Sequence, residues 1–257
     1  MGRWRDSSPR DRQLSCARKR SSPSSGRRPD CPALATWQAW VVVSSAIARA
    51  PKGVTGIALT FDDGPGAVTQ ALLDVLRRHA AQATFNVLGE RIEAREHMLR
   101  RAVDEGHEIG VHGWSHRDHR DDPVARAADA ARTADAVEAV CGVRPRLFRP
   151  PFGLTNSRLN KALAAHGLTT ILWDVDPRDV EEPGACVIYV RILSAIYPGS
   201  IVLLHDDREE LAPTADAVDG VLARLRRRGW PAVTVSDLLR RTSSPTTKHT
   251  PAPDTGP

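Results

Sequence analysis

The chain has 257 residues, of which 41% are hydrophobic, enough for one large α/β domain or two small ones with a substantial core. Its formal net charge of +5 arises at the N-terminus, because residues 1–30 carry nine basic against three acidic side chains, which leaves residues 31–257 close to −1. The remainder lacks the basic excess of a nucleic-acid-binding domain, so we expect no nucleic-acid partner.

Residues 1–52 predict a disordered basic region that holds a signal-like segment. The first 30 residues are rich in Arg, Ser and Pro, so too little apolar surface is available to offset the entropy of ordering. The apolar stretch 33–47 and the following Ala48-Arg49-Ala50 have the outline of a secretion signal with a small-x-small cleavage site. We therefore expect a secreted or cell-envelope protein, with a cytoplasmic location as the alternative. The stretch is too short for an integral membrane span.

Residues 53–241 predict a single α/β domain, followed by a disordered Thr- and Pro-rich tail at 242–257. Apolar runs predict seven strands, at 56–61, 84–88, 107–111, 146–149, 168–173, 200–204 and 232–235. Amphipathic stretches predict helices between them, at 68–79, 91–105, 122–140, 156–166, 185–196 and 214–228. This alternation favours a mostly parallel sheet in a distorted, TIM-barrel-like (β/α)7 barrel. An open doubly wound sheet is the alternative, but no G-x-G-x-x-G follows the first strand.

Two adjacent carboxylates, Asp62 and Asp63, end the first predicted strand. The Gly64-Pro65 break behind them allows both to turn towards one cleft, where one binds a metal and the other moves protons. A solvated Asp-Gly turn is the simpler interpretation of these residues in isolation.

Histidines follow the third predicted strand in the segment His112-Gly113-Trp114-Ser115-His116. Imidazoles four residues apart lie on one side of a helical turn, close enough to bind one ion. One Asp and two His form a three-ligand set that leaves open positions for water and substrate. His119, in the charged loop that follows, is a substitute ligand. The four cysteines show no C-x-x-C spacing, which argues against a thiolate zinc site, and Cys141 and Cys186 fit buried apolar positions better than a disulfide.

Three further polar segments end later strands. Phe148-Arg149-Pro150-Pro151-Phe152-Gly153 forms a stiff loop that holds a guanidinium and a backbone N–H in fixed directions. Trp173-Asp174-Val175-Asp176-Pro177-Arg178-Asp179 presents three acids. His205 follows an apolar run and is a candidate proton donor. All five segments lie at carboxyl ends of predicted strands, the face on which barrels of this kind build active sites.

Taken together and in order, TFDDGP, HGWSH, RPPFG, WDVDPRD and IVLLHD resemble the five motifs of the polysaccharide deacetylase family, also called NodB-homology or carbohydrate esterase family 4 enzymes. The resemblance spans about residues 54–240. It implies a distorted seven-stranded barrel enzyme that removes acetyl groups from N-acetylated sugars, such as chitooligosaccharide or peptidoglycan, or O-acetyl groups in some members. It also implies a divalent metal, usually zinc, with cobalt or nickel as alternatives, and an acetylated oligo- or polysaccharide as the partner.

The resemblance also implies a role for each matching residue. Asp63, His112 and His116 would bind the metal, and Asp62, held by Arg149, would be the general base. His205 would be the general acid, oriented by Asp176. The Phe152 N–H would stabilise the oxyanion, and Leu203 would form an apolar wall for the acetyl methyl group.

This chain departs from the family pattern at two positions. The family usually has Ser or Thr after the first metal-binding histidine, where the hydroxyl helps to fix the loop, and this chain has Gly113. The family's fourth motif commonly ends in Asp-Trp, and this chain has Asp179-Val180, which changes the wall of the acetyl pocket.

Three other functions remain open on the sequence. The first is hydrolysis of a small non-sugar amide or imide on the same barrel, which the missing tryptophan at Val180 leaves open. The second is an iron-dependent oxygenase, because two His and one carboxylate also suit ferrous iron. The third is a carbohydrate-binding module without activity. The proton-transfer set of Asp62 and His205 argues against the last two.

Overall fold

The computed structural model describes residues 46–117 and 122–241. The expectations for residues 1–45, for His119 and for the tail at 242–257 lie outside the described residues. The described fold starts before residue 53, the start that the sequence predicts for the domain. The Ile47 N–H donates to the Thr170 carbonyl at 3.0 Å and the Ala50 N–H to the Gly199 carbonyl at 2.9 Å. Residues 47–50 therefore belong to the folded domain, and they include the small-x-small segment of the predicted signal.

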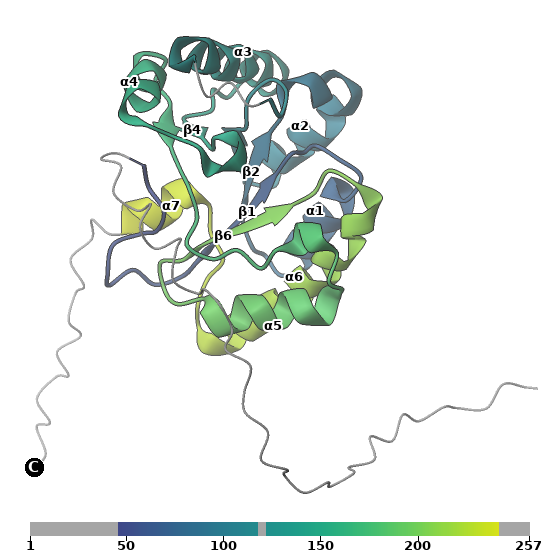
Figure 1. The fold of residues 1–257 in the computed structure, drawn as a ribbon. Helices are drawn as coiled ribbons and strands as arrows, with labels where there is room; N and C mark the ends of the chain where they lie inside the picture. Colours follow the sequence, from purple (N-terminus) through teal and green to yellow (C-terminus); the bar gives the residue numbers. More distant parts are fainter. Residues whose placement is uncertain (1–45, 118–121, 242–257) are drawn as a thin grey trace, which may run out of the picture. The chain divides into compact units, whose positions relative to one another are not determined.

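Six parallel strands form one curled sheet, a half-barrel, in the order β5-β4-β3-β2-β1-β6 (Figure 1). The strands are β1 (Ala58–Asp62), β2 (Thr84–Val87), β3 (Glu108–Val111), β4 (Leu147–Phe148), β5 (Thr169–Thr170) and β6 (Ile201–His205). A parallel bridge from Val175 to Val202 joins the segment after β5 to β6, on the opposite edge of the sheet. The predicted distorted, TIM-barrel-like α/β fold is thus confirmed.

The predicted seventh strand differs from the structure. Residues 232–235 contribute a single bridge, from Ala232 to Ile57. The chain then turns into a helix, because the Thr234 side chain accepts a hydrogen bond from the Asp237 N–H and caps the first turn.

Helices cover the sheet on its outer side (Figure 1). They are α1 (Thr69–Arg78), α2 (Glu96–Asp104), α3 (Pro123–Cys141), α4 (Ser157–Ala165), α5 (Ala185–Ala195) and α6 (Ala212–Arg228). α7 (Val235–Arg240) packs on the inner face instead, where Val235 and Leu238 cluster with Ala58 and Ile201. Short 3-10 turns lie at η2 (Gly89–Arg91), η3 (Glu93–Arg95), η4 (Pro151–Gly153), η5 (Asp179–Glu181) and η6 (Glu209–Leu211). None of the helices in the described part of the chain is long and apolar enough to cross a membrane.

Local sequence explains the ends of the longest helix. Asp122 accepts hydrogen bonds from two backbone N–H groups at the start of α3, and Pro123 occupies the first turn, where its missing N–H costs nothing. Gly142 ends the helix at a positive φ of 69°. α3 is therefore a well-defined rod along one side of the sheet, beside α4.

The core lies between the strands and the helices that cover them. Every residue of β1 is buried, and Phe61 stacks on Phe85 of β2 with the ring centroids 5.1 Å apart. The predicted apolar stripe of α6 is buried as well, from Val218 to Leu225. This packing fixes the strand ends, from which the polar segments emerge. Of the two cysteines in the described residues, Cys141 is half-buried and Cys186 is exposed, so the expected burial of Cys186 is wrong; both are free thiols.

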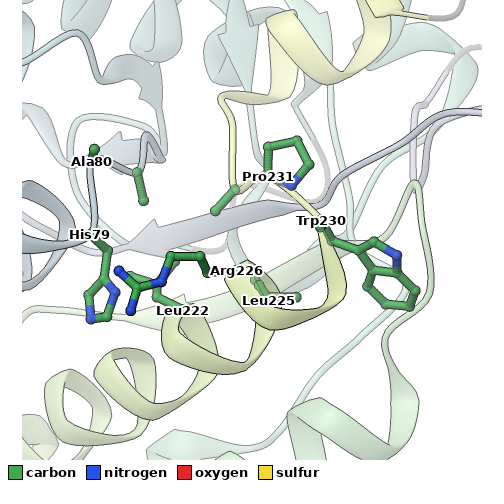
Figure 2. Close-up of a pocket in the computed structure, with 10 residues that line it drawn as sticks. His79, Ala80, Leu222, Leu225, Arg226, Trp230 and Pro231 are labelled. Carbon is green, nitrogen blue, oxygen red and sulfur yellow. The ribbon is translucent and has the colours of Figure 1, made fainter.

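One groove lies away from the predicted site segments. Figure 2 shows it beside α6, lined by side chains that include His79, Arg226 and Trp230. Its lining also includes Ala232, whose backbone pairs with Ile57 just before β1 begins. The groove therefore lies at the amino ends of the strands, opposite the polar segments.

Candidate active site

The predicted site residues come from the carboxyl ends of adjacent parallel strands. Asp62 is the last residue of β1, and in the sheet register it lies opposite His205, the last residue of β6, and Asn86 of β2. His112 follows the end of β3 and Arg149 follows the end of β4. Parallel strands bring these ends to one edge, so residues far apart in the chain become neighbours.

Asp63, His112 and His116 come together as a group that could hold a metal ion. One ligand atom from each lies within 4.8 Å of the other two. Asp63 Oδ1 is 3.5 Å from His112 Nε2 and 3.7 Å from His116 Nε2. This Asp and two His set matches the donors that zinc and similar divalent ions bind.

The protonation states of the two histidines suit a cation. Burial lowers the pKa of His112 and of His116, which favours the neutral imidazole that binds metals. His112 Nδ1 lies 2.7 Å from the Arg149 carbonyl, so Nδ1 carries the proton and Nε2 is left to bind. Asp63 Oδ1 is buried and has no hydrogen-bond partner among the described residues. A metal ion would satisfy this oxygen, so the donor set fits.

The two histidines are presented by a loop and not by the helical turn that their spacing predicts. Residues 112–117 lie outside the helices. Gly113 has a φ of +98°, which a helix does not allow and which favours glycine. The imidazoles still meet, with ring centroids 5.2 Å apart.

Asp62 lies beside this group, and its side chain is buried and hydrogen-bonded. Its side chain is 3% exposed, and Oδ1 accepts from Arg149 Nη1 at 2.8 Å and from Asn86 Nδ2 at 2.7 Å. Burial alone would raise the pKa of Asp62. The charges of Arg149, His112 and His205 and the hydrogen bond from Asn86 outweigh burial and lower it. Asp62 is therefore held as a carboxylate, with Oδ2 3.9 Å from His112 Nε2.

Arg149 itself is completely buried. Its guanidinium donates to the Thr60 hydroxyl at 2.6 Å and to the Leu172 carbonyl at 2.9 Å in addition to Asp62. These contacts fix one orientation of the guanidinium, and through it one orientation of Asp62.

Asn86 is a site residue that lies outside the five motifs. It is fully buried, and its position depends on Gly110 of β3, because a Cβ there would lie 2.2 Å from Asn86 Oδ1. A signal was present in the sequence, since Asn86 is an amide inside the apolar strand Phe85-Asn86-Val87, and a buried amide needs partners.

His205 is oriented by Asp179 and not by Asp176, which corrects the expectation for Asp176. Nδ1 of His205 lies 2.9 Å from Asp179 Oδ1, and its backbone N–H donates to Asp179 Oδ2 at 2.9 Å. Asp179 is fully buried, because the 3-10 turn η5 folds the chain back under the end of β6. Asp176 is exposed and accepts from the Arg178 N–H at 2.8 Å.

The charges around His205 favour its protonated form. Burial alone would lower the pKa of His205. The hydrogen bond to Asp179 and the charges of Asp179, Asp62 and Asp63 raise it instead, to about 9. The third acid of this segment, Asp174, belongs to a different contact: it accepts from the Tyr197 hydroxyl at 2.5 Å and the Ile201 N–H at 2.8 Å, near the start of β6.

Phe152 and Leu203 take different positions at the site. Phe152 has a positive φ of 59° and is 61% exposed, and its ring packs edge-on to His116 with centroids 4.5 Å apart. Leu203 is buried in β6, two residues before His205. Val180, where the family commonly has Trp, is 42% exposed.

The chain resembles several known proteins. A family model described as polysaccharide deacetylase matches residues 49–171. The chain is 38% identical over 184 residues to the peptidoglycan-N-acetylmuramic acid deacetylase PdaC of Bacillus subtilis, a match that covers 71% of this chain and 38% of PdaC. It is 36% identical over 193 residues to a chitooligosaccharide deacetylase of a Bradyrhizobium species, covering 70% of this chain and 88% of the relative.

The fold has solved counterparts. The crystal structure of the Bc1960 peptidoglycan N-acetylglucosamine deacetylase matches with a TM-score of 0.72 and 30% identity, over 76% of this chain and 93% of that one. The chain spans only about two fifths of the length of the first curated relatives that it matches, 38% of one and 41% of another. The similarity therefore concerns only part of those longer proteins.

Proposed function

The chain belongs to the polysaccharide deacetylase family, and from that membership we propose that it is a metal-dependent hydrolase that removes acetyl groups from N-acetylated carbohydrate and releases acetate. The observation that carries the proposal is the arrangement around the Asp63, His112 and His116 group. A carboxylate held by Arg149 lies beside the group, and a protonated imidazole held by Asp179 lies within its electrostatic reach. This is a base and an acid beside one candidate ion site.

Asp63, His112 and His116 would hold the metal, and zinc is our first choice, with cobalt or nickel as alternatives. Such an ion supplies Lewis-acid chemistry: it lowers the pKa of a bound water and polarises the acetyl carbonyl. His119, the substitute ligand, is not needed to complete the three-ligand set.

The protein residues would perform the proton transfers. Asp62 accepts a proton from the attacking water, since its low pKa keeps it ionised and its Oδ1 partners leave Oδ2 for the reaction. The Phe152 N–H donates to the oxyanion as it forms, and Leu203 contacts the acetyl methyl group. His205 gives its proton to the departing nitrogen when the C–N bond breaks. The products are acetate and a free amine.

An acetylated oligo- or polysaccharide is the proposed substrate class. The relatives are named for peptidoglycan and for chitooligosaccharide, both of which carry N-acetyl groups. Because peptidoglycan lies in the cell wall, outside the cytoplasm, we propose a secreted or cell-envelope location. Hydrolysis of a small non-sugar amide or imide is the second candidate, and Val180 favours it because the apolar wall that Trp commonly supplies is absent there.

Mass spectrometry of reaction products tests the proposal. Purified protein with zinc is incubated with N-acetylglucosamine oligomers, cell-wall fragments and a panel of small amides, and each product is examined for the loss of one acetyl mass per site. We expect loss from the glycans, and loss from small amides alone would favour the second candidate. Protein that binds one zinc ion and an oligosaccharide but releases no acetate would contradict both and favour a binding module.

A matched variant tests the role of Asp62. Asp62→Asn keeps the shape of the side chain and all three metal-binding residues, so zinc affinity should stay unchanged while turnover falls by about 100-fold or more. Retained turnover in this variant would contradict the assignment of Asp62 as the base.

A further inference from the structure

The two histidines of the metal group are supported in different ways. His112 directly follows β3, its backbone N–H donates to the Val87 carbonyl at 2.8 Å, and its side chain is 4% exposed. His116 lies four residues further along the loop, and its side chain is 32% exposed. The position of His116 Nε2 therefore depends on what holds residues 113–115.

Backbone hydrogen bonds from η2 hold one side of this loop. The Gly89 N–H donates to the Gly113 carbonyl at 3.0 Å, and the Glu90 N–H donates to the Trp114 carbonyl at 2.9 Å. The Trp114 ring lies directly against Gly89, because a Cβ there would be 2.4 Å from the ring carbon Cε3. Residues 113–114 of the loop therefore pack closely against η2.

Helix α3 holds the other side. Asp129 Oδ2 accepts a hydrogen bond from the Trp114 N–H at 2.7 Å. One turn further along α3, the Arg132 guanidinium carbon lies 3.4 Å from the centroid of the Trp114 ring, in a stacking contact. Residues three apart on a helix share a face, so one face of α3 contacts both the backbone and the ring of Trp114.

We propose that Asp129 and Arg132 are positioning residues for the metal site, which hold Trp114 against η2 and so keep His116 within reach of Asp63. The inference rests on the proposed metal-dependent function. In the family, a hydroxyl after the first histidine helps to fix this loop. Here Gly113 has a φ of +98°, and a Cβ at that position would lie 3.2 Å from Asp129 Oδ2. The carboxylate of α3 thus occupies the space next to Gly113 while it accepts the Trp114 N–H.

Zinc affinity, measured with zinc alone by competition against a chelator, tests this role. Asp129→Ala removes the acceptor and should weaken zinc binding about 10- to 100-fold, the usual effect of losing a contact that orients a ligand. Asp129→Asn keeps an oxygen acceptor for the Trp114 N–H and should stay close to the wild type. Asp135→Ala, an exposed position on the same helix that pairs with Arg144, is the control and should bind zinc normally.

The melting temperature of the metal-free protein is recorded for each variant, because a purely structural role would lower this value and leave zinc affinity unchanged. Arg132→Ala removes only the stacking contact, and it should weaken zinc binding several-fold even if Asp129→Ala fails to fold. If the Asp129→Ala and Arg132→Ala variants both bind zinc with wild-type affinity, this inference is overturned and the proposed function is not. A wild-type protein that binds no zinc would overturn the proposed function together with it.

Discussion

Both carboxylate oxygens of Asp179 are hydrogen-bonded to His205, one to the imidazole Nδ1 and the other to the backbone N–H, each at 2.9 Å. The contact to Nδ1 fixes the orientation of the ring and leaves Nε2 for the substrate, and the contact to the backbone N–H holds the acid beside His205. The Thr214 hydroxyl also donates to Asp179 Oδ2 at 3.1 Å, so the acid is itself held in place.

The first prediction compares Asp179 with Asp176. Asp179→Asn should lower the pKa of His205 and reduce kcat about 100-fold or more at neutral pH, because the general acid loses its proton and its orientation. Asp176→Asn is the matched control and should have a small effect, since Asp176 accepts from the Arg178 N–H and not from His205. Acetate release measured between about pH 5 and 10 distinguishes the Asp179→Asn variant from the Asp176→Asn variant. Equal losses in both variants would contradict the assignment of Asp179.

The second prediction concerns stability and pH in the metal-free protein. The pKa of His205 rises from 6.5 to about 9 on folding, so the folded state binds this proton more tightly than the unfolded state. The resulting stabilisation is fully present below pH 6.5 and is lost as pH rises through 9. The free energy of unfolding of the wild type relative to His205→Gln should therefore fall by about 3 kcal/mol across this window. Urea unfolding at both ends measures it, and a constant difference would refute the prediction.

The third prediction concerns the buried pair of Arg149 and Asp62. Arg149→Met leaves the Asp62 carboxylate buried without its cation and should lower the free energy of unfolding by about 3–5 kcal/mol. The double variant Arg149→Met/Asp62→Asn removes that charge and should recover part of the loss. Urea unfolding of both proteins without metal provides the comparison. A double variant no more stable than the single one would show that the unpaired charge is not the cause.

The fourth prediction concerns metal addition and removal. Zinc at 100 times its Kd should raise the free energy of unfolding by about 2.7 kcal/mol, because the ion binds the folded group of Asp63, His112 and His116. A chelator should reverse the gain, and His112→Ala should show little of it. Thermal unfolding with zinc, cobalt and nickel in turn would also rank the three ions. Equal gains in the wild type and in His112→Ala would place the ion elsewhere.

Much of the site could be predicted from local sequence. Asp62, His112, Arg149 and His205 each follow a short apolar run, and such runs form buried parallel strands whose carboxyl ends share one edge. The seventh strand was mispredicted because the apolar pattern at 232–235 does not reveal that Thr234 caps a helix. A cap depends on one side-chain hydrogen bond, which outweighs a weak strand preference.

The sequence alone could not show which side chains form hydrogen bonds with one another. The sequence offers Asp174, Asp176 and Asp179 within six residues, and only the fold of η5 shows that Asp179 reaches His205, 26 residues away. Asn86 meets Asp62 across 24 residues, and Asp129 meets Trp114 across 15. Hydrophobic periodicity shows which face of a helix or strand is buried, because the pattern lies within one segment of the chain. Hydrogen bonds between loops depend on atomic positions set by the packing of the whole barrel, so only the tertiary structure reveals them.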